Sequence, residues 1–252
     1  MYFNDVNILY YIGATILGLI VGEFTNWLNK RLPDYKKVFE KGAFKEYKAT
    51  FNPSYILMIL TAVIYVALLY KFGISNKFIQ NLDLIKYYIL TPILLSTFVI
   101  DYHYQIIPNR LVLTMFEIGL VFVFIYGFSN VAISINMLLG MLAGGGIFLG
   151  ITLLGGLVYG KEAMGLGDVK FMGALGLYFG LTNIILIALI SFLVGAILSI
   201  IILAFKIKKT DEYIPFGPFI VIATFVIIFI PYELIVTVLL NIFTLGLYSK
   251  KY

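Results

Sequence analysis

The chain has 252 residues, of which 62% are hydrophobic and only 12% are charged. A soluble domain is about half apolar and about 25% charged, so the composition excludes an ordinary soluble enzyme and indicates that lipid surrounds most of the chain. The formal net charge is +5, which basic cytosolic loops explain better than nucleic-acid binding does.

Segments long enough to cross a membrane recur along the chain. A helix needs roughly 20 apolar residues to cross about 30 Å of hydrocarbon. The sequence predicts an all-α transmembrane bundle of about eight spans, in one membrane domain of residues 1–252. We expect the spans at residues 8–28, 55–69, 87–100, 111–128, 133–159, 169–179, 184–205 and 216–231.

Two of these spans and the tail that follows the last one leave details open. The third and sixth spans are short, so they extend into neighbouring loops or enter at an angle. The apolar tail at residues 232–247 follows Pro231 and is a kinked continuation, an interfacial helix or a ninth span. The N-terminus lacks the basic region of a signal peptide, so we expect the first span to stay in the mature protein.

Basic residues set the expected orientation. With eight spans, 13 of the 18 Lys and Arg residues fall on one side and 5, including Lys86, on the other. The richer side is expected to be cytosolic, with both termini outside, in the cell (inner or cytoplasmic) membrane. Residues 29–52 hold seven basic and three acidic residues and are expected to form a solvated basic cytosolic loop.

Residue counts restrict the chemistry. The chain has no cysteine and one histidine, His103. Disulfides, thiolate metal sites and cysteine nucleophiles are therefore excluded, and so are metal sites built from several histidines. We expect no metal, and His103 is simply a solvated loop residue. Carboxylates remain the best candidates for hydrolysis.

Four acidic residues lie within or at the ends of the spans, namely Glu23, Asp101, Glu117 and Asp168. Ionisable groups at membrane depth are costly and suggest function. Glu23 and Glu117 are more simply explained as hydrogen-bond partners between helices. The alternative for Glu117 is a third acid that tunes the aspartates.

Both aspartates are expected where helices end. Asp101 closes the third span, and Pro108 soon afterwards forces a turn. Asp168 opens the sixth span after Gly165 and Gly167, whose backbones can turn tightly. Either aspartate alone is explained equally well as a polar helix end.

The pair is more informative than either member, because both fall at the same cytosolic boundary. Two nearby carboxyl groups cannot both ionise cheaply, so they share a proton. The ionised group can activate water, while the protonated one polarises a carbonyl. Lys170 could either stabilise a nearby carboxylate or anchor the helix end at lipid headgroups.

A glycine-rich face is expected on the fifth span. Small residues at four-residue spacing favour close packing between membrane helices. The glycines concerned are Gly140, Gly144, Gly145, Gly146 and Gly150.

Four segments together resemble the type IV prepilin peptidases, membrane aspartyl proteases of the Gly-x-Gly-Asp type. The resemblance covers most of the chain, and residues 29–52 resemble the cysteine-free members that lack a zinc-binding insertion. The segments are GATILGLIVGEFTNWLNKRLP (13–33), DYHYQIIPN (101–109), GKEAMGLGDVKFMGALG (160–176) and IPFGPF (214–219).

The resemblance implies a catalytic pair and a reaction. Asp101 and Asp168 would be catalytic, and the reaction would remove a short basic leader from prepilins or pseudopilins at the cytosolic face, in pilus assembly or protein secretion. The implied partners are these substrates and membrane lipid, with no nucleic acid. Gly165, Gly167, Lys170, Pro108 and Asn109 would be supporting motif residues.

Two alternatives stay open. Some members of the family also methylate the new N-terminus with S-adenosylmethionine, although Glu23 stands where many have a small serine. Proteolysis itself implies no cofactor. The competing function is a proton- or ion-coupled transporter, in which membrane acids and broken helices are also common.

Overall fold

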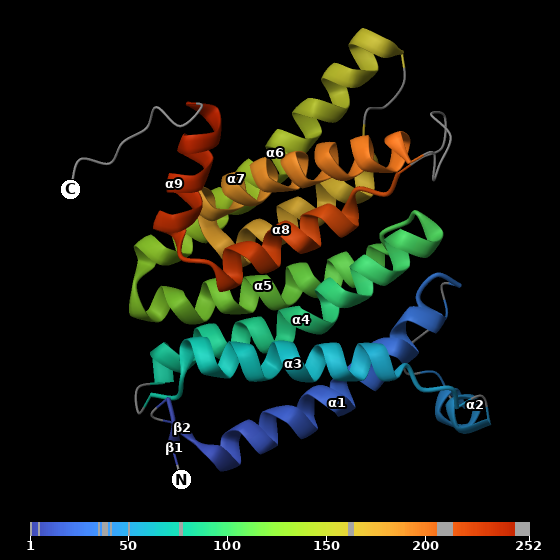
Figure 1. Ribbon diagram of the computed structural model, residues 1–252, viewed down its shortest axis with the longest axis vertical. Coiled ribbons are helices and arrows are strands. Elements are labelled where there is room, and N and C mark those ends of the chain that lie inside the picture. The colour runs from blue at the N-terminus through green and yellow to red at the C-terminus, as the bar shows by residue number, and fades with distance from the viewer. Residues whose placement is uncertain are drawn as a thin grey trace.

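The computed structural model confirms an all-α architecture (Figure 1). It describes residues 2–4, 6–34, 36, 40, 42–49, 51–75, 78–160, 164–205 and 214–244. A short antiparallel hairpin, β1 (Tyr2–Phe3) and β2 (Val6–Asn7), precedes the helices. The helices are α1 (Ile8–Arg31), α2 (Ala43–Ala49), α3 (Tyr55–Phe72), α4 (Phe78–Tyr104), α5 (Asn109–Ser129), α6 (Val131–Tyr159), α7 (Leu166–Ala204), α8 (Gly217–Phe229) and α9 (Tyr232–Phe243).

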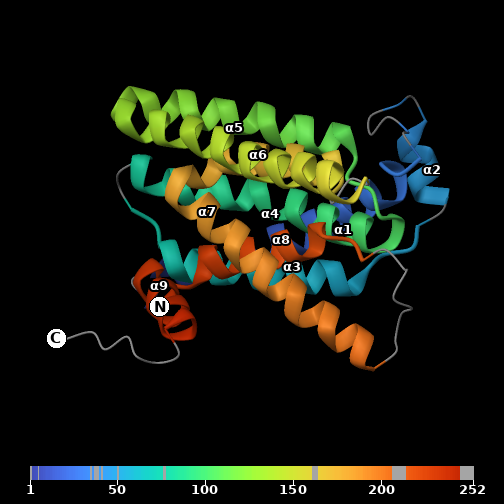
Figure 2. The same cartoon turned by 90° about the horizontal axis from the view of Figure 1, so that it is seen from above.

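The helices form two groups joined by α4. On one side α1 packs against α3, and on the other α6 packs against α7 (Figure 1). Helix α4 contacts α1 and α3 as well as α5 and α8, so it bridges the groups. The view from above shows α5 and α6 lying along the face opposite α3 and α9 (Figure 2).

Six helices in the described part of the chain are long and apolar enough to cross a membrane: α1, α3, α4, α5, α6 and α7. A multi-pass membrane protein is therefore confirmed. Helix α7 contains non-helical torsion angles at Gly180, where φ is 71° and ψ is 179°. The expected sixth and seventh spans are the two parts of α7 on either side of this residue.

The chain reverses at Gly180. Gly144 of α6 faces Met172, which precedes the break, and also Ile184, which follows it. The first part of α7 therefore runs antiparallel to α6 and the second part runs parallel to it. The positive φ favours glycine, and the amide of Leu181 donates to Asn136 Oδ1 at 3.2 Å.

The glycine face on α6 is confirmed for only part of its length. A Cβ atom on Gly140 would lie 2.5 Å from Gly176 O, and one on Gly144 would lie 2.4 Å from Met172 O. Gly145 makes only ordinary contact, and Gly146 and Gly150 have nothing within 4 Å. The expectation was wrong for these last two, because at about 100° per residue Gly146 lies about 200° and Gly150 about 240° around the helix from Gly144.

The same backbone contact joins α1 to α3. A Cβ atom on Gly18 would lie 2.4 Å from Ala62 Cα, and one on Gly22 would lie 2.5 Å from Met58 Cα. The two helices therefore approach closely through these glycines.

Helix α4 extends well before the expected start of the third span. Asp83 and Lys86 lie inside it, and Lys86 is buried, with its Nζ atom 2.8 Å from Asp83 Oδ1. The Tyr126 hydroxyl of α5 donates to the same carboxylate oxygen at 2.7 Å. The assignment of Lys86 to an exposed outer loop was wrong, because this ion pair and the rings of Tyr87 and Tyr126 surround its ammonium group.

The C-terminal helix α9 is separate from α8. Ile230 is extended before Pro231, and α9 has 12 residues, or about 18 Å at 1.5 Å per residue. It buries Ile235 and Leu239 on one face. This length does not cross the bilayer, so the interfacial alternative is favoured; residues 245–247 of the expected tail lie outside the described residues.

We predict that Gly140→Ala lowers the free energy of unfolding by about 1–3 kcal/mol, because its methyl group would clash with the α7 backbone. The matched control is Gly146→Ala on the same helix, where the methyl group meets open space and helix propensity improves by about 1 kcal/mol. Thermal unfolding in detergent would measure both, and equal midpoints would contradict the packing role.

Candidate active site

Asp101 lies in the last turn of α4, as expected. The amide of Gln105 donates to Asp101 O at 2.9 Å, and Gln105 then takes a positive φ of 56°. Pro108 is buried and precedes α5, which begins at Asn109. This turn leaves the Asp101 side chain only 4% exposed.

The start of α8 reaches Asp101 from a distant part of the sequence. The backbone N–H of Gly217 donates to Asp101 Oδ2 at 2.8 Å. Gly217 lies in the IPFGPF segment, which carried the family resemblance without an assigned role. The carboxyl group therefore caps a helix that has no side-chain cap of its own.

Asp168 lies in the first turn of α7, as expected. Its amide donates to Gly165 O at 3.1 Å, and the Gly165 backbone faces its carboxyl group. A Cβ atom on Gly167 would lie 3.3 Å from Ile107 Cβ, so this turn approaches the segment after α4 closely. Asp168 is 4% exposed, and its buried Oδ1 atom accepts no hydrogen bond from the residues that the structure describes.

The two carboxyl groups interact electrostatically, although they come from α4 and α7. Two buried carboxyl groups this close cannot both ionise without a large cost. A buried oxygen with no donor also requires a partner such as water or substrate. The arrangement therefore suits one carboxylate and one carboxylic acid that act together on a bound molecule.

Lys170 and Asn109 lie beside the pair. Lys170 is exposed, and its Nζ atom donates to Asn109 Oδ1 at 3.2 Å, which ties α7 to the start of α5. Lys170 therefore bonds a neutral amide, and its expected roles beside a carboxylate or at lipid headgroups stay predictions.

Comparison with known proteins relates the central part of the chain to one family. Residues 88–200, which include both aspartates, match the model described as the type IV leader peptidase family. Residues 88–200 belong to this family. The expected resemblance to this family is thereby confirmed, and two of the four sequence segments, residues 101–109 and 160–176, lie inside the matched range.

Curated relatives in this leader peptidase family carry the name prepilin leader peptidase/N-methyltransferase. The Xanthomonas campestris protein is 34% identical over 175 residues, covering 69% of this chain and 58% of the relative. The proteins from Legionella pneumophila and Pseudomonas aeruginosa are 36% and 37% identical, each over 54% of this chain and over 47% and 46% of their own lengths. The chain thus spans about half the length of these relatives. No solved structure gives a significant match.

The remaining titratable candidates lie away from the pair. Glu117 is exposed on α5, so the expectation of a buried hydrogen-bond partner was wrong. His103 is exposed, as expected, but it lies in the last turn of α4 and not in a loop, with its ring 5.2 Å from that of Tyr102.

Glu23 is a structural hydrogen-bond acceptor. Its carboxylate accepts from Tyr47 Oη at 3.0 Å, from the Ser54 amide at 3.2 Å and from Asn26 Nδ2 at 3.2 Å. It therefore ties α1 to α2 and to the start of α3, which confirms its expected role.

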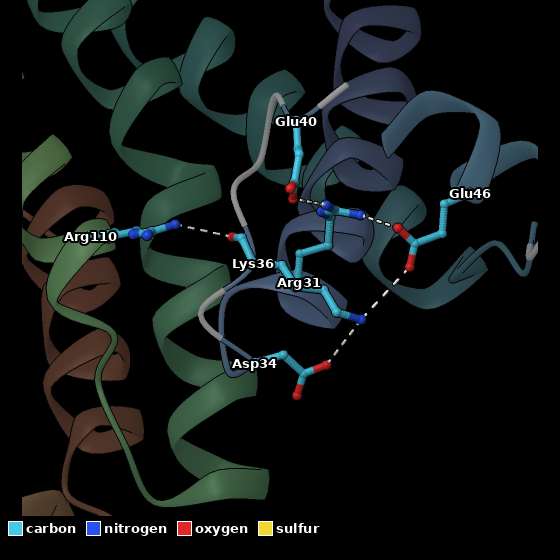
Figure 3. A network of polar contacts seen from close by, with 6 residues as sticks. All are labelled: Arg31, Asp34, Lys36, Glu40, Glu46 and Arg110. Carbon is cyan, nitrogen blue, oxygen red and sulfur yellow. Dashed lines mark hydrogen bonds and ion pairs between the residues drawn. The ribbon is translucent and has the colours of Figure 1, made fainter. Parts of the chain in front are cut away.

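The described part of residues 29–52 is folded against the end of α1, not simply solvated (Figure 3). Arg31 is 5% exposed, and its guanidinium lies 2.6 Å from Glu46 and 3.7 Å from Glu40. Lys36 lies 3.7 Å from the other Glu46 oxygen, and its carbonyl accepts from Arg110 at 3.2 Å. The charges of residues 29–52 had predicted a solvated loop and did not indicate that an arginine would be buried.

The Arg31 hydrogen bond holds the pKa of Glu46 below its usual range. A lowered carboxyl pKa stabilises the folded loop above the ordinary glutamate pKa, and this contribution disappears as pH falls through the lowered value.

We predict that Arg31→Gln releases α2 and changes the fluorescence of Trp27, the single tryptophan, whose ring lies 5.8 Å from the guanidinium. In the wild type the same change should appear only on acidification below the usual glutamate range. Asp34→Asn is the control. It removes an exposed carboxylate that lies 3.4 Å from Lys36 and leaves the contacts of Arg31 with Glu46 and Glu40 in place. A wild-type spectrum in Arg31→Gln at neutral pH would refute this role.

Proposed function

We propose that this chain is an aspartyl endopeptidase that removes the short basic leader from prepilin-like proteins, with Asp101 and Asp168 as its catalytic pair. The observation that carries the proposal is the meeting of these two buried carboxyl groups, from α4 and α7, inside the family region. The names of the relatives supply the substrate class.

The pair can hydrolyse a peptide bond with its own two groups. The carboxylate takes a proton from water as the water oxygen attacks the peptide carbonyl carbon, and the carboxylic acid protonates the carbonyl oxygen. As the tetrahedral intermediate breaks down, the first group returns its proton to the leaving amine and the second recovers a proton from the hydroxyl. Both groups then regain their starting states.

The position of the pair suits a substrate that is partly in the membrane. Asp101 ends one helix and Asp168 begins another, so both lie at the end of the bundle where α1 leads into α2. A prepilin-like helix in the bilayer with its leader in the cytosol would place the scissile bond at this level. Basic residues gather at this end of the bundle: Lys30 and Arg31 end α1, Arg110 begins α5 and Lys170 lies in the second turn of α7. Their position supports a cytosolic orientation.

The same placement weighs against an ion-coupled transporter. Transporters hold their ions near the bilayer midplane, at breaks within helices. The break at Gly180 carries no acidic side chain, and the aspartates lie at helix ends.

The names of the relatives include a second activity, that of an N-methyltransferase. It would use S-adenosylmethionine, which carries a cationic sulfonium and several polar groups. The 430 Å³ groove beside Glu23 does not fit this molecule, because its lining is largely apolar, including Phe24, Trp27 and Phe51, and neutral donors already occupy the Glu23 oxygens.

We predict that Asp101→Asn and Asp168→Asn each reduce cleavage of a co-expressed prepilin by about 10²–10⁴-fold, because each removes a proton-transfer group. Mass spectrometry of the pilin N-terminus would measure cleavage and would show any added methyl mass. His103→Ala, an exposed neighbour of Asp101, should cleave normally.

Thermal unfolding of each variant would exclude misfolding as the cause of lost activity. Wild-type cleavage by either Asn variant would refute the catalytic pair. An uncut substrate with the wild-type enzyme would overturn the assignment to prepilin processing.

A further inference from the structure

The two carboxyl groups of the pair are not equivalent. Asp101 Oδ2 accepts a hydrogen bond of 2.8 Å from the Gly217 amide, and this contact is buried. The Gly165 backbone lies beside Asp168 Oδ2, but Asp168 Oδ1 is buried and accepts no hydrogen bond from any side chain or amide in the described ranges. A buried carboxylate needs donors, whereas a carboxylic acid needs fewer.

The geometry of α8 directs one particular amide to Asp101. The amides of Phe219 and Ile220 both donate to Phe216 O, at 3.0 and 3.3 Å. Pro218 has no N–H group. Of the three amide N–H groups at positions 217–220, only that of Gly217 is left to bond outside its own turn, and it carries the partial positive charge of a helix start.

The turn before α8 is held firmly. The ring of Phe216 lies 5.1 Å from that of Phe192 and 5.9 Å from that of Phe148. This packing fixes the residue that precedes Gly217 and therefore fixes the direction of its N–H group. A Cβ atom on Gly217 would lie 2.6 Å from Asp101 Oδ2, so a side chain would displace the carboxylate.

We propose that Gly217 is a positioning residue that holds Asp101 as the carboxylate of the pair and thereby leaves the shared proton on Asp168. Asp101 is then the general base that deprotonates water, and Asp168 is the general acid that protonates the peptide carbonyl. This inference rests on the proposed proteolytic function and adds the direction of proton transfer to it.

The ionisable groups around Asp101 are consistent with this assignment. Helix α8 carries no ionisable side chain, and α7 contributes Asp168. The nearby basic groups contact other acceptors: Lys170 bonds Asn109, Arg110 bonds Lys36 O, Lys30 bonds Asn52 O and Arg31 bonds Glu46.

The first test is the pH profile of Gly217→Ala. We expect kcat to fall by about 10–100-fold, as for loss of one hydrogen bond to a charged group, with KM little changed. The acidic limb of the profile should move to higher pH, because Asp101 loses the donor that favours its charged form.

The matched control is Gly119→Ala on α5. A Cβ atom there would lie 2.9 Å from Leu177 Cβ, so it disturbs the packing of α7 without touching Phe216 or either aspartate. It should leave the acidic limb in place. If Gly217→Ala loses rate but keeps the wild-type pH profile, Gly217 is merely structural and the proposal is wrong.

The second test does not depend on activity or on folding of Gly217→Ala. Infrared difference spectra at neutral pH would compare the wild type with Asp168→Asn. We expect the variant to lose the C=O stretching band of a protonated carboxyl group. Loss of a carboxylate band instead would place the proton on Asp101 and overturn the inference.

These tests separate the two proposals. A wild-type protein that cuts no prepilin but loses the acid band in Asp168→Asn would refute the proposed substrate while retaining the direction of the pair. Normal cleavage together with loss of a carboxylate band would support the proposed substrate and refute the placement of the proton on Asp168.

Discussion

The arrangement around the active site depends on the cost of burying two carboxyl groups at the edge of a membrane protein. Each is 4% exposed, and such groups need hydrogen-bond donors or a shared proton. The chain supplies these from helix ends: α4 ends at Asp101, α7 begins beside Asp168, and α8 directs its first amide inward. Three helices must therefore end at one level, and the loops that join them follow from that requirement.

Close helix packing keeps those ends in register. Gly140 and Gly144 bring the backbones of α6 and α7 into contact, and Gly18 and Gly22 do the same for α1 and α3. Because interhelical contacts between backbones tolerate little sliding, these glycine contacts place the start of α7 relative to α6. The ion pair between Asp83 and the buried Lys86 joins the opposite end of α4 to α5 through Tyr126.

Sequence patterns were sufficient where they reflect local chemistry. Asp101 and Asp168 could be found because acids are scarce in apolar segments and because proline and glycine mark helix ends. Contacts over long sequence distances could not be found in this way: Gly217 and Asp101 are 116 residues apart. Gly146 and Glu117 show a different limit, since composition identifies a residue suited to an interface but not the side of the helix that faces it.

The buried Arg31 and Lys86 show why charge counting describes orientation better than structure. Both were counted as loop residues, and both are buried beside carboxylates and aromatic rings. A long cationic side chain can enter such an environment when its charge is paired and its alkyl part packs. Neither partner is evident until helix boundaries and loop folds are known.

The reversal at Gly180 has a consequence for the lipid around the protein. It limits the part of α7 that begins near Asp168 to about 21 Å, and α8 with its 13 residues is about 20 Å long. Both are shorter than the roughly 30 Å hydrocarbon layer, and such mismatch is relieved by local thinning of the bilayer. Thinning of this kind would draw the aqueous boundary toward the two helices that lie beside the aspartates.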